Sequence, residues 1–182
     1  MSFFNKNSND FRLRISIEGA QNLAVADANG LSDPYAVLLI DNKKYGKTTV
    51  NKKTLHPVWN LHTNIPLHFD KPHHLIEIFV WDKDRLRDAK FKDIIKVNKE
   101  VIGDDFLGKI SIPVGQLFDL VNPSGRALEY DSPQNEDVIL TLEKRNHQDN
   151  VSGELLLRFG IIKGPDSGNR DVAKFWEDYI NQ

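Results

Sequence analysis

The residues of this sequence with the clearest chemical potential are aspartates, which gather in two segments far apart along the chain. The first segment holds Asp27 and Asp33, and the second begins with Asp82 and Asp84 at the end of an expected strand and resumes at Asp104–Asp105. Alternate residues of a strand project to the same side, so Asp82 and Asp84 would present both carboxylates to one site. A hard cation such as Ca²⁺ takes about six to eight oxygen ligands. Paired aspartates on two facing loops therefore predict a calcium site.

Each aspartate taken alone has an ordinary explanation, because aspartate is common in solvent-exposed turns. The set is harder to explain in that way. Several carboxylates held a few ångströms apart without a cation would repel one another and raise their own pKa values. We therefore interpret the set, though no single member of it, as a metal site.

Composition limits the classes of protein that fit this chain. Its 182 residues suit one domain better than two, and 40% of them are hydrophobic, which is enough for a core. The absence of cysteine excludes disulfides and thiolate metal sites and predicts a reducing compartment. The longest apolar run, 35–40, is far too short to span a bilayer. Segment 1–10 is rich in Asn and Ser, lacks the apolar stretch of a signal peptide, and is expected to be disordered.

Periodic apolar residues predict the strands that must position these aspartates. In 11–18, apolar residues alternate with polar ones, which is the pattern of a half-buried strand. The same reasoning, with turn residues between the runs, predicts eight strands over 11–18, 35–40, 44–50, 64–69, 75–81, 106–112, 138–143 and 153–162. The predicted fold is all-β, an eight-stranded antiparallel β-sandwich.

Two helices and one long insertion interrupt the strands. Pro113 precedes an expected crossover helix over 114–121. Segment 171–182 has apolar residues at i, i+3, i+4, i+7 and i+8, which predicts an amphipathic helix capped by Asp171. The insertion 85–103 is long for a loop of a small sandwich, and such loops are usually functional or disordered. The expected organisation is therefore a sandwich domain over 11–163, followed by a linker and a helix over 164–182.

Four short motifs occur in the order found in C2 domains, and the resemblance covers about 11–163. Residues 30–35 (GLSDPY) look like part of the first calcium loop. Residues 54–60 (TLHPVWN) resemble a second motif of the family, with His56 in place of the usual asparagine. Residues 81–84 (WDKD) and 105–108 (DFLG) resemble the two sides of the third loop.

The resemblance implies a set of calcium ligands, made of five aspartates and two backbone carbonyls. The aspartates are Asp27, Asp33, Asp82, Asp84 and Asp105, and the carbonyls belong to Ala26 and Lys83. The insertion separates Asp84 from Asp105 by twenty residues, which is more than is usual in the family, and Asp104 is the substitute ligand if the register shifts. The strand order resembles the type II topology, because the first strand leads into the first calcium loop and an extra strand ends the domain.

Residues near these loops are the expected lipid contacts. Val25 and Leu31 are apolar residues of the first loop, and Arg85 and Arg87 begin the mixed basic and apolar insertion, a composition suited to an anionic membrane surface. The alternative for the insertion is a helix or loop with ordinary solvated charges.

A second lipid site is suggested on the strand pair around 35–50. Tyr35, Lys47 and Trp81 match positions of a phosphoinositide site found in some C2 domains. The match is partial, because Val37, Leu39 and Thr49 stand where lysines would be needed. The alternative is a charged sheet edge that discourages strand pairing.

The function predicted from these features is calcium-dependent binding of anionic phospholipid membranes, with phosphatidylserine as the first candidate lipid and phosphoinositide as the second. Bound calcium would neutralise a strongly negative end of the sandwich and let it approach an anionic leaflet. We expect a membrane-targeting module of a larger signalling or lipid-metabolising protein, cytoplasmic and recruited peripherally to membranes. The alternative is a calcium-independent protein–protein interaction module.

Other classes of function receive little support from the sequence. It has no nucleophile–base motif and no phosphate loop, so we do not expect an enzyme. A formal net charge of −2 and the lack of aromatic RNA-binding motifs argue against nucleic acid as a partner. Phe175 and Trp176, on the C-terminal helix, either cap the sandwich or offer a surface to a protein partner.

Overall fold

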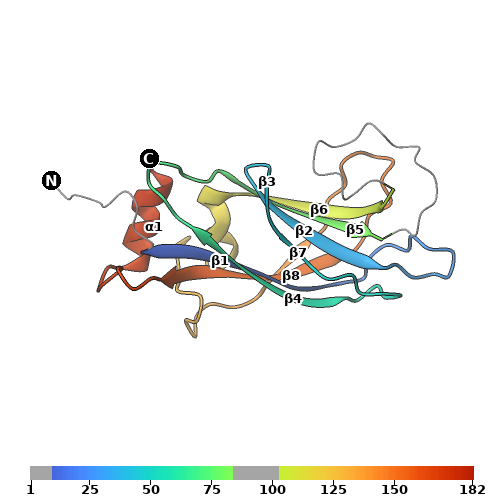
Figure 1. Ribbon diagram of the computed structural model, residues 1–182, viewed down its shortest axis with the longest axis horizontal. Coiled ribbons are helices and arrows are strands. Elements are labelled where there is room, and N and C mark those ends of the chain that lie inside the picture. Colours follow the sequence, from blue (N-terminus) through green and yellow to red (C-terminus); the bar gives the residue numbers. More distant parts are fainter. Residues whose placement is uncertain (1–9, 84–102) are drawn as a thin grey trace.

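The chain folds into two four-stranded sheets packed face to face (Figure 1). The structure is a computed structural model and describes residues 10–83 and 103–182. The strand order is β4-β1-β8-β7 in the first sheet and β3-β2-β5-β6 in the second, and neighbouring strands are antiparallel. The predicted eight-stranded antiparallel sandwich is confirmed. Segment 1–9, within the predicted disordered terminus, lies outside the described residues, as does most of the insertion.

The first sheet joins strands from both ends of the chain. It contains β1 (Phe11–Gln21), β4 (Val58–Pro66), β7 (Val138–Thr141) and β8 (Glu154–Lys163). The last strand, β8, lies between β1 and β7 and pairs with the whole length of β1. The second sheet contains β2 (Pro34–Ile40), β3 (Lys43–Lys47), β5 (Leu75–Asp82) and β6 (Asp105–Pro113).

Strand β4 departs most from the sequence prediction, which was wrong about its bounds. It begins at Val58 rather than at residue 64 and ends at Pro66 rather than at residue 69. Its inward residues include Trp59 and Ile65, which are buried as core residues. Its outward residues Asn60, His62 and Asn64 are polar and exposed. Only part of each face is apolar, so the sequence of β4 shows only a weak alternation of apolar and polar residues.

The core lies between the two sheets. The inward residues of β1, including Phe11 and Ile17, meet those of β2, including Leu38 and Ile40. Every residue of β2 is buried, because its other face belongs to a second apolar cluster. That cluster, on the outer face of the second sheet, consists of Tyr35, Val37, Leu39, Phe79 and Trp81.

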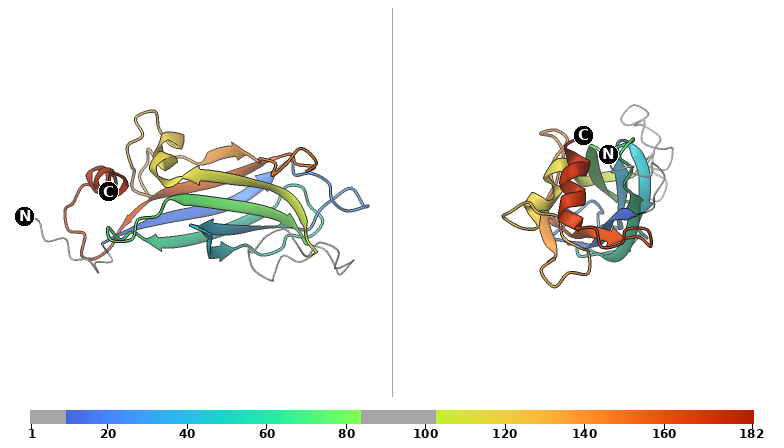
Figure 2. Two further views of the ribbon diagram at one scale, coloured as in Figure 1. Left: turned by 90° about the horizontal axis from the view of Figure 1, so that it is seen from above. Right: turned by 90° about the vertical axis from the view of Figure 1, so that its left-hand side faces the viewer.

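Both predicted helices are present, and the longer one closes one end of the sandwich (Figure 2). The crossover segment η1 (Val114–Leu120) is a 3₁₀ helix, and α1 (Val172–Ile180) is an α-helix. The side chain of Asp171 accepts a hydrogen bond from the Lys174 amide at 2.8 Å, so the predicted cap is confirmed. No helix in the described parts of the chain is long and apolar enough to cross a membrane.

The aromatic face of α1 is buried against the sandwich. The Phe175 ring stacks on Phe11 with centroids 3.9 Å apart, and Trp176 meets Phe118 edge-on at 5.0 Å. Both rings are core residues. They cap the sandwich, as one of the two sequence interpretations held, and are not a free surface for a partner.

A polar cluster ties the β2–β3 turn to this helical end. The Asp41 carboxylate accepts hydrogen bonds from the His73 side chain at 2.9 Å and from the amides of His74 and Leu75 at 3.0 Å. Burial alone would raise the pKa of Asp41, but these hydrogen bonds outweigh it and lower the pKa below its ordinary value. The His73 amide in turn donates to the Tyr179 hydroxyl at 2.7 Å, and burial raises the pKa of Tyr179 to about 12.

Candidate functional site

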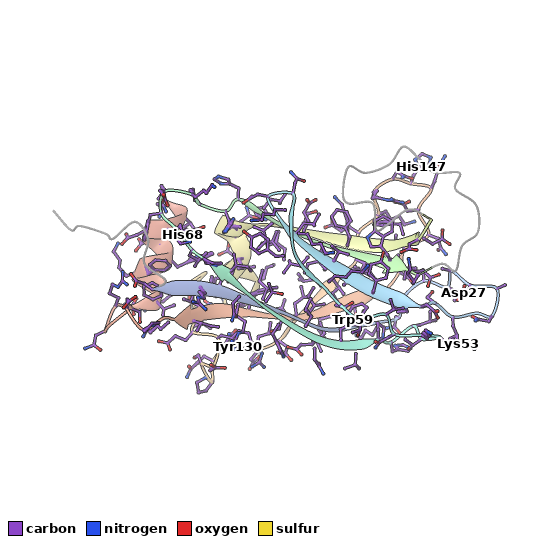
Figure 3. The ribbon with its side chains drawn as sticks, viewed as in Figure 1. Asp27, Lys53, Trp59, His68, Tyr130 and His147 are labelled. Atoms are coloured by element: carbon purple, nitrogen blue, oxygen red, sulfur yellow. The ribbon has the colours of Figure 1, made fainter. Side chains whose placement is uncertain are left out.

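Those predicted calcium residues that the structure describes lie at the end of the sandwich opposite α1. The β1–β2 connection 22–33, the β3–β4 connection 48–57 and the two flanks of the insertion meet there (Figure 1). Figure 3 labels Asp27 and Lys53 at this end. The sandwich therefore brings together segments that lie far apart in the sequence.

The first loop is built around a turn from Asp27 to Leu31. The Asp27 amide donates to the Leu31 carbonyl at 3.0 Å, and Gly30 occupies the left-handed region at φ +80°. Ser32 is fully buried and closes the loop, because its hydroxyl donates to the Ala24 carbonyl and accepts from the Ala26 amide. The motif at 30–35 thus has a structural role in shaping the loop.

Asp33 and Asp82 are brought into direct contact. Asp82 is 1% exposed, and its carboxylate accepts a hydrogen bond from the Asp33 amide. The Asp33 carboxylate accepts a hydrogen bond from the Lys53 amide at 2.7 Å, so the β3–β4 connection is also joined to these residues. The Lys83 amide donates to the Asp33 carbonyl at 3.0 Å. These contacts join three of the predicted ligand residues, at the start of β2 and the end of β5, into one constellation.

The register of β5 with β6 separates the roles of Asp104 and Asp105. Asp105 pairs with Asp82 in the ladder and is exposed. The Asp104 side chain is 1% exposed and accepts hydrogen bonds from the Tyr35 hydroxyl at 2.6 Å and from the Lys83 ammonium at 2.9 Å. Asp104 thus belongs to a buried polar network that sequence reasoning missed, and Asp105 stands at the exposed position opposite Asp82.

The remaining predicted ligands are not gathered with these residues by any described contact. Asp84 lies outside the described residues. Within 10–83 and 103–182, no group of three acidic or histidine side chains is close enough to hold a metal ion. Three predicted ligands do lie next to one another, because Asp33 contacts Asp82 and Asp105 pairs with Asp82 in the β-ladder. Their side chains offer only oxygen atoms, which are the ligands that a hard cation takes. Their chemistry fits calcium, whereas the five-aspartate set stays a prediction.

The predicted lipid contacts fall into two groups. Val25, on the first loop, is 45% exposed, and Leu31 is half-buried; Ala26, predicted as a carbonyl ligand of calcium, lies beside Val25 and is also half-buried. Arg85 and Arg87 lie outside the described residues. The other group lies on the outer face of the second sheet, where the Lys47 ammonium sits 4.4 Å from the centre of the Tyr35 ring. The Trp81 ring is buried beside Phe79 and meets Phe106 edge-on at 5.4 Å.

A further connection, which no motif in the sequence indicated, reaches this end of the molecule. The β7–β8 connection, 142–153, touches the first loop, because the Ser152 hydroxyl donates to the Asn22 carbonyl at 2.9 Å. Figure 3 labels His147 in this connection. Arg145 reaches across to the Phe106 ring, with its guanidinium carbon 3.7 Å from the ring centre. The sequence could not predict the contact of Arg145 with Phe106, because an arginine and an aspartate four residues apart, as at 145 and 149, are a common pattern.

A groove of about 630 Å³ lies on the outer face of the first sheet beside the same end. Its apolar lining includes Val58, Ile139 and Leu156, and its charged lining includes Glu18, Asp137 and Arg158. Arg158 is already paired with Asp137 at 2.6 Å. A lining with both signs of charge does not select one class of ligand.

Comparison with known sequences gives a match to a family and to longer proteins. The sequence model described as "C2 domain" matches residues 11–132. The Rho GTPase-activating protein gacEE of Dictyostelium discoideum is 28% identical over 149 residues, which is 81% of this chain and 20% of that protein. The chain therefore spans about a fifth of the length of this relative.

Comparison with solved structures shows the same fold. A C2 domain of a plant extended synaptotagmin 1 superposes with a TM-score of 0.58 at 16% identity, covering 86% of this chain and 97% of that one. A structure of two C2 domains of extended synaptotagmin 2, solved with calcium bound, superposes with a TM-score of 0.54 at 24% identity. That match covers 85% of this chain and 46% of the other.

Proposed function

The chain belongs to the C2 domain family, and from this premise we propose that it binds calcium and thereby docks on anionic phospholipid membranes. A C2 domain is a binding module rather than a catalytic one, and membrane lipids are the general ligand of the family. The further step, dependence on calcium and a preference for phosphatidylserine, is the proposal.

The observation that carries the proposal is the contact between Asp33 and Asp82. Two acidic residues 49 positions apart in the sequence meet at the end of the sandwich, joined by a hydrogen bond from the Asp33 amide to the Asp82 carboxylate. Asp82 is 1% exposed, and carboxylate oxygens such as its own are the ligands that a hard cation takes. Asp27, Asp84 and Asp105, with the carbonyls of Ala26 and Lys83, would complete the oxygen ligands when the cation binds.

The chain's own residues explain how such binding would lead to docking. The five predicted carboxylates would repel an anionic leaflet, and bound divalent cations would supply the positive charge that removes this repulsion. A phosphatidylserine headgroup would add further oxygen ligands. Val25, which is already 45% exposed, and Leu31 enter the interface as apolar contacts.

Finer proposals concern a second lipid site, the larger protein, the localisation and the strand topology. Lys47 above the Tyr35 ring supplies one basic group for a phosphoinositide headgroup on the outer face of the second sheet. The match to a fifth of the length of the Rho GTPase-activating protein gacEE supports a role as the targeting module of a larger signalling protein. Such a module is cytoplasmic and reaches membranes peripherally. The strand order, with β8 between β1 and β7, supports the type II topology.

One observation favours a second candidate function, a calcium-independent protein-interaction module. The Lys83 ammonium pairs with Asp104 at 2.9 Å, so the polypeptide itself provides a positive charge beside the acidic loops. A domain that neutralises part of its acidic end in this way has less need of a metal.

Liposome sedimentation with calcium titration tests the proposal. The wild-type chain should sediment with phosphatidylserine vesicles only when calcium is present, and Asp33→Asn with Asp82→Asn should abolish this. Asp166→Asn with Glu177→Gln, at exposed positions at the α1 end, is the matched control, because it also removes two carboxylate charges but away from the site. Calorimetry that detects no calcium binding at millimolar concentration would favour the protein-interaction module.

A further inference from the structure

The β7–β8 connection, 142–153, is fastened to both sheets at the end that carries the predicted calcium residues. On the side of the first sheet, Ser152 donates to Asn22 at 2.9 Å. On the side of the second sheet, Lys109 and Glu143 exchange backbone hydrogen bonds of 3.0 and 2.8 Å. The connection therefore has a fixed position relative to the proposed site.

Within this connection, Arg145 is held in place by Asp149. The guanidinium donates to both carboxylate oxygens, from Nε at 3.2 Å and from Nη2 at 2.9 Å. The amides of Arg145 and Asn146 donate to the same carboxylate. The hydrogen bond from the Arg145 side chain is the main cause of a lowered pKa of Asp149. Such a bidentate pair fixes both the direction and the plane of a guanidinium.

The fixed guanidinium lies over residues that adjoin two predicted calcium ligands. It is 3.7 Å from the centre of the Phe106 ring and 5.6 Å from that of Trp81. Phe106 follows Asp105 in the chain, and Trp81 precedes Asp82. A cation within about 6 Å of an aromatic centre is attracted to its face.

The backbone needs such support at this point. The β5–β6 register shifts between Val80 and Trp81, so that Val80 pairs with Gly108 and Trp81 with Phe106. A bulge of this kind leaves one residue without a ladder partner and loosens the pairing next to it. Beyond the bulge, only Trp81 with Phe106 and Asp82 with Asp105 are paired. Arg145 contacts the rings of Trp81 and Phe106 in this short stretch.

We infer that Arg145 is a positioning residue of the proposed calcium site, which acts through the Phe106 ring to hold Asp105 beside Asp82. This inference rests on the proposed function. The positive charge of Arg145 by itself repels a calcium ion, so electrostatics alone predicts tighter calcium binding when Arg145 is removed, whereas the positioning role predicts weaker binding. Removal of Arg145 should weaken calcium binding if positioning is the stronger effect and strengthen it if charge is the stronger effect.

Calcium calorimetry on point variants separates these effects. Arg145→Gln should bind calcium about fivefold more weakly, which is the order of one exposed cation–π contact. Lys144→Gln removes the same charge from the exposed neighbouring residue and should leave the affinity unchanged or slightly tighter. Equal or tighter binding by Arg145→Gln overturns the inference. If that variant does not fold, Arg145→Lys, which keeps the charge and loses the bidentate pair with Asp149, takes its place with the same expected loss.

A double-mutant cycle tests whether the effect passes through the ring. Phe106→Leu should weaken calcium binding about as much as Arg145→Gln, and the double variant should lose no more than the worse single variant. Phe106→Tyr keeps the aromatic face and should retain the wild-type affinity. Additive losses in the cycle would show that Arg145 does not act through Phe106.

Amide hydrogen exchange in the calcium-free protein distinguishes failure of this inference from failure of the proposed function. Arg145→Gln should speed exchange at residues 105 and 106 by about fivefold and leave exchange in the centre of β1 unchanged. If the wild type binds no calcium, the proposed function fails, yet this exchange measurement still decides whether Arg145 orders the start of β6. Unchanged exchange at both residues refutes the positioning role.

Discussion

Replacement of Trp176 by alanine is expected to destabilise the whole domain, because the C-terminal helix supplies part of its core. Trp176 is 2% exposed, meets Phe118 edge-on at 5.0 Å and stacks on Tyr179 at 5.6 Å. Truncation of a buried aromatic ring of this size costs about 3–5 kcal/mol through lost burial and the cavity left behind. A loss of this magnitude is a large part of the stability of a typical domain.

Urea unfolding followed by far-ultraviolet circular dichroism measures this loss. With a slope of about 2 kcal/mol per molar urea, the midpoint should fall by about 1.5–2.5 M. Lys174→Ala on the exposed face of the same helix is the control and should leave the midpoint nearly unchanged, since its ion pairs are solvent-exposed.

A loss below about 1 kcal/mol for Trp176→Ala would refute the packing of α1 on the sandwich. A single unfolding transition in both variants would support the reasoning, because α1 and the strands would then unfold together. In that case the domain extends through α1, beyond the boundary at 163 that the sequence suggested.

Three further perturbations have definite expected outcomes. Asp41→Asn should lower stability near neutral pH in urea titrations. The pKa of Asp41 is lowered in the folded state, so its contribution to stability is present above the unfolded-state pKa of about 3.8 and is lost as the pH falls through the folded-state pKa. The difference between variant and wild type should therefore shrink below about pH 3.8. Gly153→Ala should destabilise strongly, since φ is +98° and a Cβ atom would lie 2.5 Å from the Gln21 carbonyl oxygen, whereas Gly115→Ala meets no atom within 4 Å and should be close to neutral in thermal melts. Tyr35→Phe should cost about 1–3 kcal/mol in urea unfolding, because a buried carboxylate loses its hydroxyl donor.

The fold was largely predictable because most strands carry enough apolar residues to show a period. The alternation in β1 and the continuous apolar run of β2 both correspond to their burial. Strand β4 was misplaced, since polar residues such as Asn60 and His62 fill its outer face and a threonine interrupts its inner face. Pairing with β1, rather than local composition, determines where β4 begins.

The candidate site was predictable in residue type but not in detail. The order of the motifs indicated the segments that meet, and the contact of Asp33 with Asp82 agrees with it. Nothing in the adjacent pair at 104–105 indicated that one carboxylate would turn inward to Lys83 and the other outward. That outcome depends on the strand register, which a bulge near Trp81 changes by one residue. Contacts such as that of Arg145 with Phe106 join remote loops and leave no local pattern in the sequence.

The position of β8 also constrains how the chain is synthesised. The long edge of β1 has its partner about 140 residues later in the sequence, because Phe11 pairs with Lys163 and Gln21 with Glu154. At about 5–20 residues per second, a ribosome takes on the order of ten seconds to produce that partner. During this interval β1 can pair with β4, but its other edge is an unpaired strand edge open to other nascent chains. The first sheet cannot be completed until β8 has been synthesised, so chaperones that cover exposed strand edges have a defined interval in which to act.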